Sequence, residues 1–143
     1  MSVKWRDSMS VGVAHLDDDH QQLLDYLNRL EDALLNNAGA SKQVAQVLLG
    51  VMQYTEEHFE REEQAMSAAG CRDLEVHRAE HLDLTTKARD LAHKYTQAPD
   101  GETAWAFYDL LSNWLTNHII QRDVPEARYL KPYYAGRYIP ARS

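Results

Sequence analysis

The chain has 143 residues, of which 44% are hydrophobic and 26% charged, and its formal net charge is −7. These values fit a single globular domain over residues 1–143 and exclude a disordered chain. An acidic chain repels phosphate backbones, so we expect no nucleic-acid binding. The N-terminus lacks a signal-peptide core, and no run reaches the roughly 18 apolar residues of a membrane span. We therefore expect a cytoplasmic protein without a membrane span.

The composition favours an all-α fold, because only six Gly and four Pro interrupt a chain rich in helix formers. The first predicted helix runs from about Asp17 to Asn36. Its apolar side chains recur at helical spacing. They are Leu16, Leu23, Leu24, Leu27, Leu30 and Leu34. An N-terminal arm, residues 1–16, precedes this helix.

Three further stretches show the same spacing. Ser41 is a candidate N-cap for the second, which runs to about Met66 and stops at Ala69-Gly70. Asp73 is a candidate cap for the third, and Ala98-Pro99-Asp100-Gly101 marks the turn before the fourth. Their apolar stripes are Val44, Val47, Leu48, Val51, Thr55 and Phe59; Leu74, Leu84, Ala88 and Leu91; and Phe107, Leu111, Trp114 and Leu115.

Four helices joined by short loops predict an antiparallel up-down-up-down four-helix bundle over about residues 17–122. The short C-terminal segment, residues 124–143, is rich in tyrosine. We expect Tyr133, Tyr134 and Tyr138 to pack over the bundle as ordinary surface cover.

Polar side chains interrupt each apolar stripe at positions that face the bundle centre. Residues four apart differ by only about 40° around a helix axis, so each such pair projects into one volume. The interrupting residues are His20, His58, Glu62, His77, His81 and His118. A buried carboxylate requires a cationic partner, and no lysine or arginine shares these stripes. A metal ion is therefore the predicted partner.

Asp123 is a further candidate ligand, although it follows His118 by five residues. That spacing is an offset of about 140° on an ideal helix, which would not aim both side chains at one site. Pro125 disfavours helical geometry at Val124. A π-type turn at 119–123 would bring the carboxylate back toward the centre. Five imidazoles and two carboxylates exceed the needs of one ion, and their nitrogen and oxygen donors favour iron, manganese or zinc.

The ordered motif His20, His58-x3-Glu62, His77-x3-His81, His118-x4-Asp123 resembles that of the hemerythrin family in its bacterial single-domain form. The resemblance covers about residues 5–125. Flanking residues also match, namely Trp5, Val11-Gly12-Val13, Asp17, Phe59, Glu63, Met66, Trp114, Leu115 and Ile119. The loop at Cys71-Arg72 departs from the family's usual Tyr-Pro.

The resemblance implies a non-haem centre of two iron ions joined by an oxo or hydroxo group. It places His77, His81 and His118 on one iron and His20 and His58 on the other, with Glu62 and Asp123 bridging them. The second iron keeps a coordination site open for O2. The helical phase gives candidate residues for an apolar O2 pocket. They are Leu23, Leu24, Met66, Trp114, Leu115 and Ile119.

The leading functional hypothesis is therefore reversible O2 binding for storage, delivery or buffering, by a protein that is not an enzyme. O2 would be its ligand, and an oxygen-consuming enzyme or a signalling protein would be its partner. A sensor acting through such a partner, a di-iron oxidase, peroxidase or nitric-oxide-processing enzyme, and a metal store remain alternatives. We expect His15 and His93 to lie outside the ligand set and the loop thiol of Cys71 to be incidental.

Overall fold

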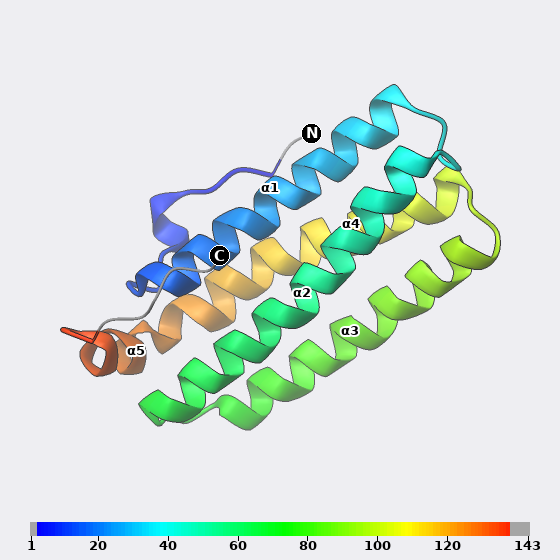
Figure 1. The fold of residues 1–143 in the computed structure, drawn as a ribbon. Helices are drawn as coiled ribbons and strands as arrows, with labels where there is room; N and C mark the ends of the chain where they lie inside the picture. Colours follow the sequence, from blue (N-terminus) through cyan, green and yellow to red (C-terminus); the bar gives the residue numbers. More distant parts are fainter. Residues whose placement is uncertain (1–2, 138–143) are drawn as a thin grey trace.

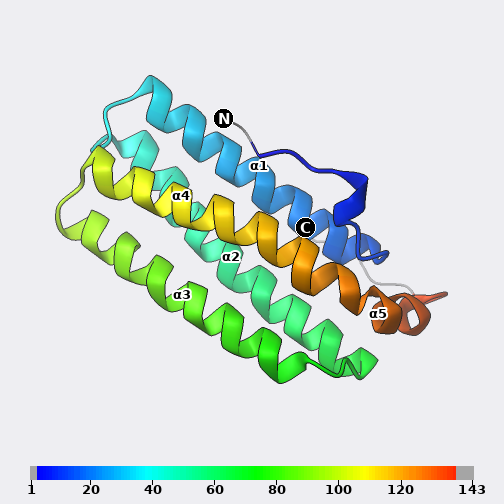
Figure 2. The same ribbon diagram turned by 180° about the vertical axis from the view of Figure 1, so that it is seen from behind.

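The structure is a computed structural model that describes residues 3–137. Four long helices form the bundle: α1 (Ala14–Asn36), α2 (Lys42–Ala69), α3 (Leu74–Gln97) and α4 (Gly101–His118). Each runs antiparallel to the one before it, and α4 returns to lie beside α1 (Figures 1 and 2). The predicted all-α four-helix bundle is confirmed.

The helix ends show how the local sequence sets these bounds. Ser41 caps α2 as predicted, because its hydroxyl accepts a hydrogen bond from the N–H of Val44 at 3.2 Å. Gly70 ends α2 in the left-handed conformation, with φ of 70°, which glycine adopts without steric cost. Asp73 occupies the N-cap position of α3, but its side chain makes no capping hydrogen bond.

The first helix begins three residues before its predicted start. The carboxylate of Asp17 accepts hydrogen bonds from the Val11 N–H at 2.8 Å and the Ser10 hydroxyl at 2.6 Å. Asp17 therefore lies inside the first turn and ties the N-terminal arm to α1. The arm also contains a short 3-10 helix, η1 (Asp7–Met9).

The predicted apolar stripes form the core. All six stripe residues of α1 are buried, as are most of those on α2, α3 and α4. Four residues of the predicted stripes are only half-buried at the edges of the bundle, and these are Val47, Leu74, Leu91 and Trp114. A second buried cluster closes the end of the bundle where the arm meets the C-terminal segment. It contains Val11, Val13, Leu16, Ala65, Met66, Cys71 and Leu130.

Beyond α4 the chain continues as a π-helix, η2 (Ile119–Asp123), a 3-10 turn, η3 (Val124–Glu126), and the short helix α5 (Ala127–Tyr134). Tyr134 packs against the second cluster as expected, and Tyr129 does so too. Tyr133 is half-buried, and its ring contacts that of Tyr134 with centroids 4.8 Å apart. Tyr138 lies outside the described residues. Within residues 3–137, no helix is long and apolar enough to cross a membrane.

Candidate metal centre

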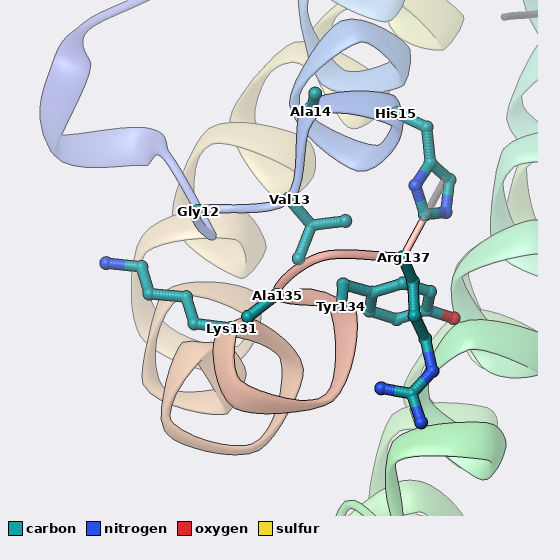
Figure 3. Close-up of a pocket in the computed structure, with 8 residues that line it drawn as sticks. All are labelled: Gly12, Val13, Ala14, His15, Lys131, Tyr134, Ala135 and Arg137. Atoms are coloured by element: carbon teal, nitrogen blue, oxygen red, sulfur yellow. The ribbon is translucent and has the colours of Figure 1, made fainter. Parts of the chain in front are cut away.

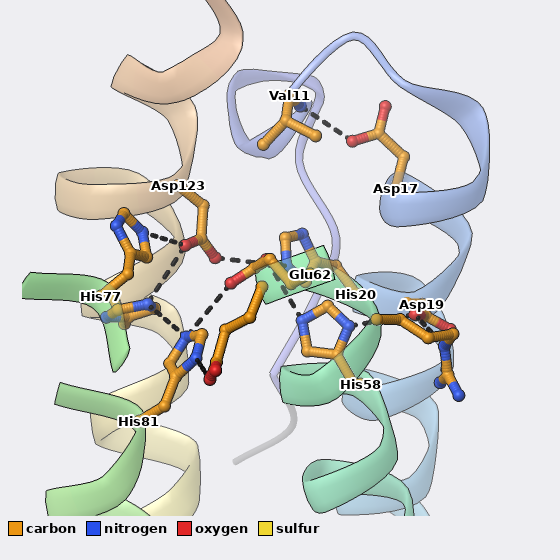
Figure 4. Close-up of polar contacts among 12 residues, drawn as sticks. Val11, Asp17, Asp19, His20, His58, Glu62, His77, His81 and Asp123 are labelled. Carbon is orange, nitrogen blue, oxygen red and sulfur yellow. Dashed lines mark hydrogen bonds and ion pairs between the residues drawn. The ribbon is translucent and has the colours of Figure 1, made fainter. Parts of the chain in front are cut away.

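The seven predicted ligand side chains meet in the middle of the bundle. Each residue is at most 5% exposed. They come from α1 (His20), α2 (His58, Glu62), α3 (His77, His81), α4 (His118) and the π-helix (Asp123). The imidazoles surround the two carboxylates in Figure 4. The structure therefore brings together all seven residues that the sequence predicts as metal ligands.

Glu62 lies between the histidines of opposite sides. Its Oε2 is 3.0 Å from Nε2 of His20 and 3.3 Å from Nε2 of His58, and its Oε1 is 3.1 Å from Nε2 of His81. Oε2 of Glu62 thus faces histidines of α1 and α2, and Oε1 faces a histidine of α3. That is the arrangement a carboxylate needs to bridge two cations.

Asp123 reaches the centre through the predicted change of helix type. The stretch Ile119–Asp123 is a π-helix, which confirms the π-type turn expected from the five-residue spacing. Oδ1 of Asp123 lies 3.0 Å from Nε2 of His77 and 3.1 Å from Nε2 of His118. Its Oδ2 lies 3.2 Å from Nε2 of His20. Asp123 therefore spans the same two sides as Glu62.

Two groups of donor atoms have the spacing of metal sites. Glu62, His77, His118 and Asp123 form one group, and His20, His58 and Glu62 form the other, with all donor atoms in a group within 4.8 Å of one another. Glu62 belongs to both groups. His81 lies beside the first group, its Nε2 being 3.2 Å from Nε2 of His118.

The electrostatics of the cluster favour bound positive charge. Burial alone would lower the pKa of His20, but the carboxylates of Asp123 and Glu62, both within 3.2 Å of its Nε2, raise that pKa to about 10. Burial would likewise lower the pKa of His81, but the carboxylates of Glu62 and Glu63 beside its ring raise that pKa to about 9. The carboxylates therefore attract cations strongly enough to keep protons on buried imidazoles when no metal competes.

The same charges act on the carboxylates. Burial would raise the pKa of Glu62, yet the charge of His58 and a hydrogen bond from His20 hold that pKa well below its usual range. Burial and the charge of Glu62 would raise the pKa of Asp123, but the imidazoles of His118 and His20 beside it outweigh both effects and hold that pKa below its usual range. Both bridging candidates are therefore anionic.

The donor set fits a metal centre better than a hydrogen-bond network. Oε1 of Glu62 and Oδ2 of Asp123 are buried and have no hydrogen-bond partner within the described chain. Imidazole nitrogens of His81 and His20 lie within 3.2 Å of these oxygens, without hydrogen-bond geometry. Lone pairs that converge in this way are satisfied by a cation placed between them.

Two ligand histidines have carboxylate partners that the sequence analysis missed. Nδ1 of His58 donates to Asp19 at 3.1 Å, and Nδ1 of His81 donates to Glu63 at 2.8 Å. Such contacts fix the tautomer and ring orientation of a metal-binding histidine. Asp19 was detectable, because it lies in phase with the buried Leu16 and Leu23. The acidic run Asp17-Asp18-Asp19 instead suggests a solvated face.

The six residues expected to form an O2 pocket differ from one another in burial and in location. Five are buried, and these are Leu23, Leu24, Met66, Leu115 and Ile119. Met66 belongs to the second cluster at the bundle end. Trp114 is half-buried, and its ring stacks on that of His118, with centroids 4.2 Å apart. A role of these residues in binding O2 stays a prediction.

The residues expected outside the ligand set do not join the cluster. His93 is exposed, and His15 is half-buried with its ring 5.3 Å from that of Tyr134. Cys71 lies in the α2–α3 loop but is buried. Burial and a hydrogen bond with Glu126 raise the pKa of its thiol to about 12, so the reactive thiolate is disfavoured.

A surface pocket of about 530 Å³ lies away from this centre, where the start of α1 meets α5. It is lined by Gly12, Val13, Ala14, His15, Lys131, Tyr134, Ala135 and Arg137. Figure 3 shows the charged ends of Lys131 and Arg137 directed apart. The cations therefore do not converge on one bound group, and the pocket contains none of the seven candidate ligands.

The fold and the donor set together define a four-helix-bundle protein with a buried group of residues able to hold metal ions. The sequence matches the family described as hemerythrin HHE cation binding domain over residues 11–123. The chain belongs to the hemerythrin family.

Individual relatives support this assignment. The chain is 31% identical over 111 residues to the bacteriohemerythrin of Methylococcus capsulatus, covering 78% of this chain and 82% of that protein. It is 29% identical to the myohemerythrin of Riftia pachyptila, over 80% of this chain and 82% of that one. A crystal structure of wild-type hemerythrin superposes with a TM-score of 0.76 at 26% identity, covering 90% of this chain and 98% of that structure.

Proposed function

We propose that this chain binds O2 reversibly at a non-haem di-iron centre, for oxygen storage, delivery or buffering. The observation that carries the proposal is the convergence of five imidazoles on two shared carboxylates inside the bundle. Six of the seven ligands fall into two groups that share Glu62, and His81 lies beside the first group, which suits two metal ions rather than one. When bound, iron supplies the electrons that O2 takes up on binding and returns on release.

The ligand set divides unevenly between the two positions. His77, His81 and His118 would hold one iron, and His20 and His58 the other, while Glu62 and Asp123 would bridge them. The position with two imidazoles has one protein ligand fewer. It therefore leaves room for an external ligand.

The protein contributes neutral donors and exclusion of water. Only two carboxylates offset the charge of two metal ions. A ligand shell with so few anions stabilises high-valent iron less than a carboxylate-rich shell would. The burial of all seven ligands keeps bulk water from the centre. Both properties support reversible binding over oxidation of an organic substrate.

The alternatives gain less support. A partner-dependent sensor would be favoured by an exposed apolar patch on the tyrosine-rich segment, yet Tyr129, Tyr133 and Tyr134 are half-buried. Ferritin-like di-iron enzymes use paired Glu-x-x-His motifs, whereas this chain has His58-x3-Glu62.

The visible spectrum of the iron-loaded protein tests the proposal. The anaerobically reduced protein is measured before exposure to air, after exposure and after removal of O2. A charge-transfer band that appears with O2 and disappears on its removal is expected. A band that never forms, or iron that oxidises at once and releases no O2, would favour an enzyme, a redox sensor or a metal store.

A further inference from the structure

Arg61 and Asp19 form an ion pair directly behind one of the candidate ligands. Asp19 is 1% exposed, and the Arg61 side chain is 23% exposed. Nε of Arg61 donates to Oδ2 of Asp19 at 2.7 Å, and Nη2 donates to Oδ1 at 2.9 Å. This bidentate contact fixes the plane of the carboxylate as well as its position.

The fixed carboxylate holds the imidazole of His58. Nδ1 of His58 donates to Oδ2 of Asp19 at 3.1 Å, as Figure 4 shows. Tyr54 adds a fourth hydrogen bond, from its hydroxyl to Oδ1 of Asp19 at 2.8 Å, and the guanidinium of Arg61 lies 5.3 Å from the Tyr54 ring centre. Both carboxylate oxygens therefore accept two hydrogen bonds each.

This arrangement determines which ring nitrogen of His58 is available to bind a metal ion. Asp19 accepts every bond that it makes, so the proton of a neutral His58 lies on Nδ1. Nε2 then carries the lone pair and points into the centre, 3.3 Å from Oε2 of Glu62. A metal ligand requires that lone pair.

We propose that Arg61 is a positioning residue that, through Asp19, orients His58 toward the metal position shared with His20. The inference rests on the proposed ligand set. It adds that one metal position depends on a charged residue outside that set.

Among residues 3–137, the other position has no equivalent clamp. Glu63, which accepts from His81, is 25% exposed, and Nε of Arg78 lies 3.5 Å from it, on a side chain that is 45% exposed. Arg122 is a natural control, because it directly precedes Asp123 as Arg61 precedes Glu62. It pairs with Glu80, at 2.9 Å, on the bundle surface.

Cobalt binding to the purified chain tests the proposal. Co²⁺, which absorbs in the visible when bound, is titrated into metal-free wild type and Arg61→Met, and the two binding steps are compared within each protein. His58→Ala and His77→Ala assign the steps, since each removes one ligand from one position. In Arg61→Met we expect the His20–His58 position to lose about 10–100-fold in affinity while the other position keeps its own.

The ratio of the two affinities separates positioning from general stabilisation, because loss of stability alone weakens both steps together. Arg122→Met should leave the ratio unchanged. Arg61→Lys keeps the charge but lacks the planar guanidinium, so most of the loss of affinity at the His20–His58 position should remain. Asp19→Asn should show the same loss as Arg61→Met.

An unchanged ratio in Arg61→Met, or full recovery by lysine, would overturn the proposed geometric role. A wild-type chain that binds fewer than two cobalt ions would instead refute the ligand set, and the inference with it.

Discussion

Nε2 of His118 lies 3.1 Å from Oδ1 of Asp123, although the two residues are five positions apart. An α-helix would separate them by about 140° around its axis. The π-helix Ile119–Asp123 reduces that offset because its turn contains more residues. A local irregularity of the backbone thus completes the candidate centre.

Shortening this turn by one residue should therefore preserve metal binding, whereas lengthening it by one residue should weaken metal binding. Deletion of the exposed Gln121 leaves a four-residue spacing, which a regular α-helix presents on one face, so binding of two metal ions should survive. Insertion of one alanine after Gln121 should turn the aspartate away and reduce the stoichiometry. Metal content per chain after loading measures both, and loss of metal in the deletion variant alone would contradict the explanation.

Glu62→Gln should reduce metal binding from two ions to at most one. The substitution keeps the size of the side chain but removes the charge that faces His20, His58 and His81. Glu60→Gln, an exposed change two residues earlier on α2, is the matched control and should bind as wild type does. Metal content measured on both proteins decides the matter, and two ions retained in Glu62→Gln would argue against bridging by this residue.

The stability of the metal-free protein should fall as the pH rises from 6.5 to 10. In the folded chain the pKa of His20 is about 10 and that of His81 about 9, against the ordinary 6.5. A raised folded pKa contributes stability that is complete below the unfolded pKa and is lost as the pH passes the folded one. Thermal unfolding at several pH values measures this slope.

Bound metal should reverse that trend, because metal ligation requires neutral imidazoles. The gap between the melting temperatures of the metal-loaded and metal-free protein should therefore widen over the same pH range. The metal-free His20→Ala variant should show a shallower slope than metal-free wild type. An equal slope in the two proteins would contradict the assignment of the effect to this histidine.

Two leucines of α1 separate packing from function. Leu23 and Leu30 are both at most 1% exposed, and truncation of either to alanine should destabilise the fold by about 2–5 kcal/mol. Only Leu23 lies one turn from His20. Leu23→Ala should therefore also change the rates of O2 release and autoxidation, whereas Leu30→Ala should not. Stopped-flow absorbance gives the rate of O2 release, and absorbance followed over a longer time gives the rate of autoxidation. Equal changes of these rates in the two variants would remove Leu23 from the proposed O2 pocket.

The sequence was sufficient to predict the bundle and the convergence of the seven polar residues, because helical periodicity determines which side chains share a face. The π-turn followed from the conflict between that periodicity and the position of Asp123. The clamp by Arg61 could not be predicted, since it joins α1 to α2 at the edge of the inward stripe. The burial of Cys71 was likewise hidden, because the arm and α5 that cover its loop lie far away in sequence.

Combined iron and O2 stoichiometry tests reversible binding of O2 by a pair of iron ions most directly. Iron content is determined on the reduced protein, O2 uptake is measured with an oxygen electrode, and O2 is then removed under argon. We expect two iron ions and one O2 per chain, with the O2 recovered and the iron again ferrous. Consumption of O2 without recovery, or uptake by a chain that holds a single iron, would contradict it.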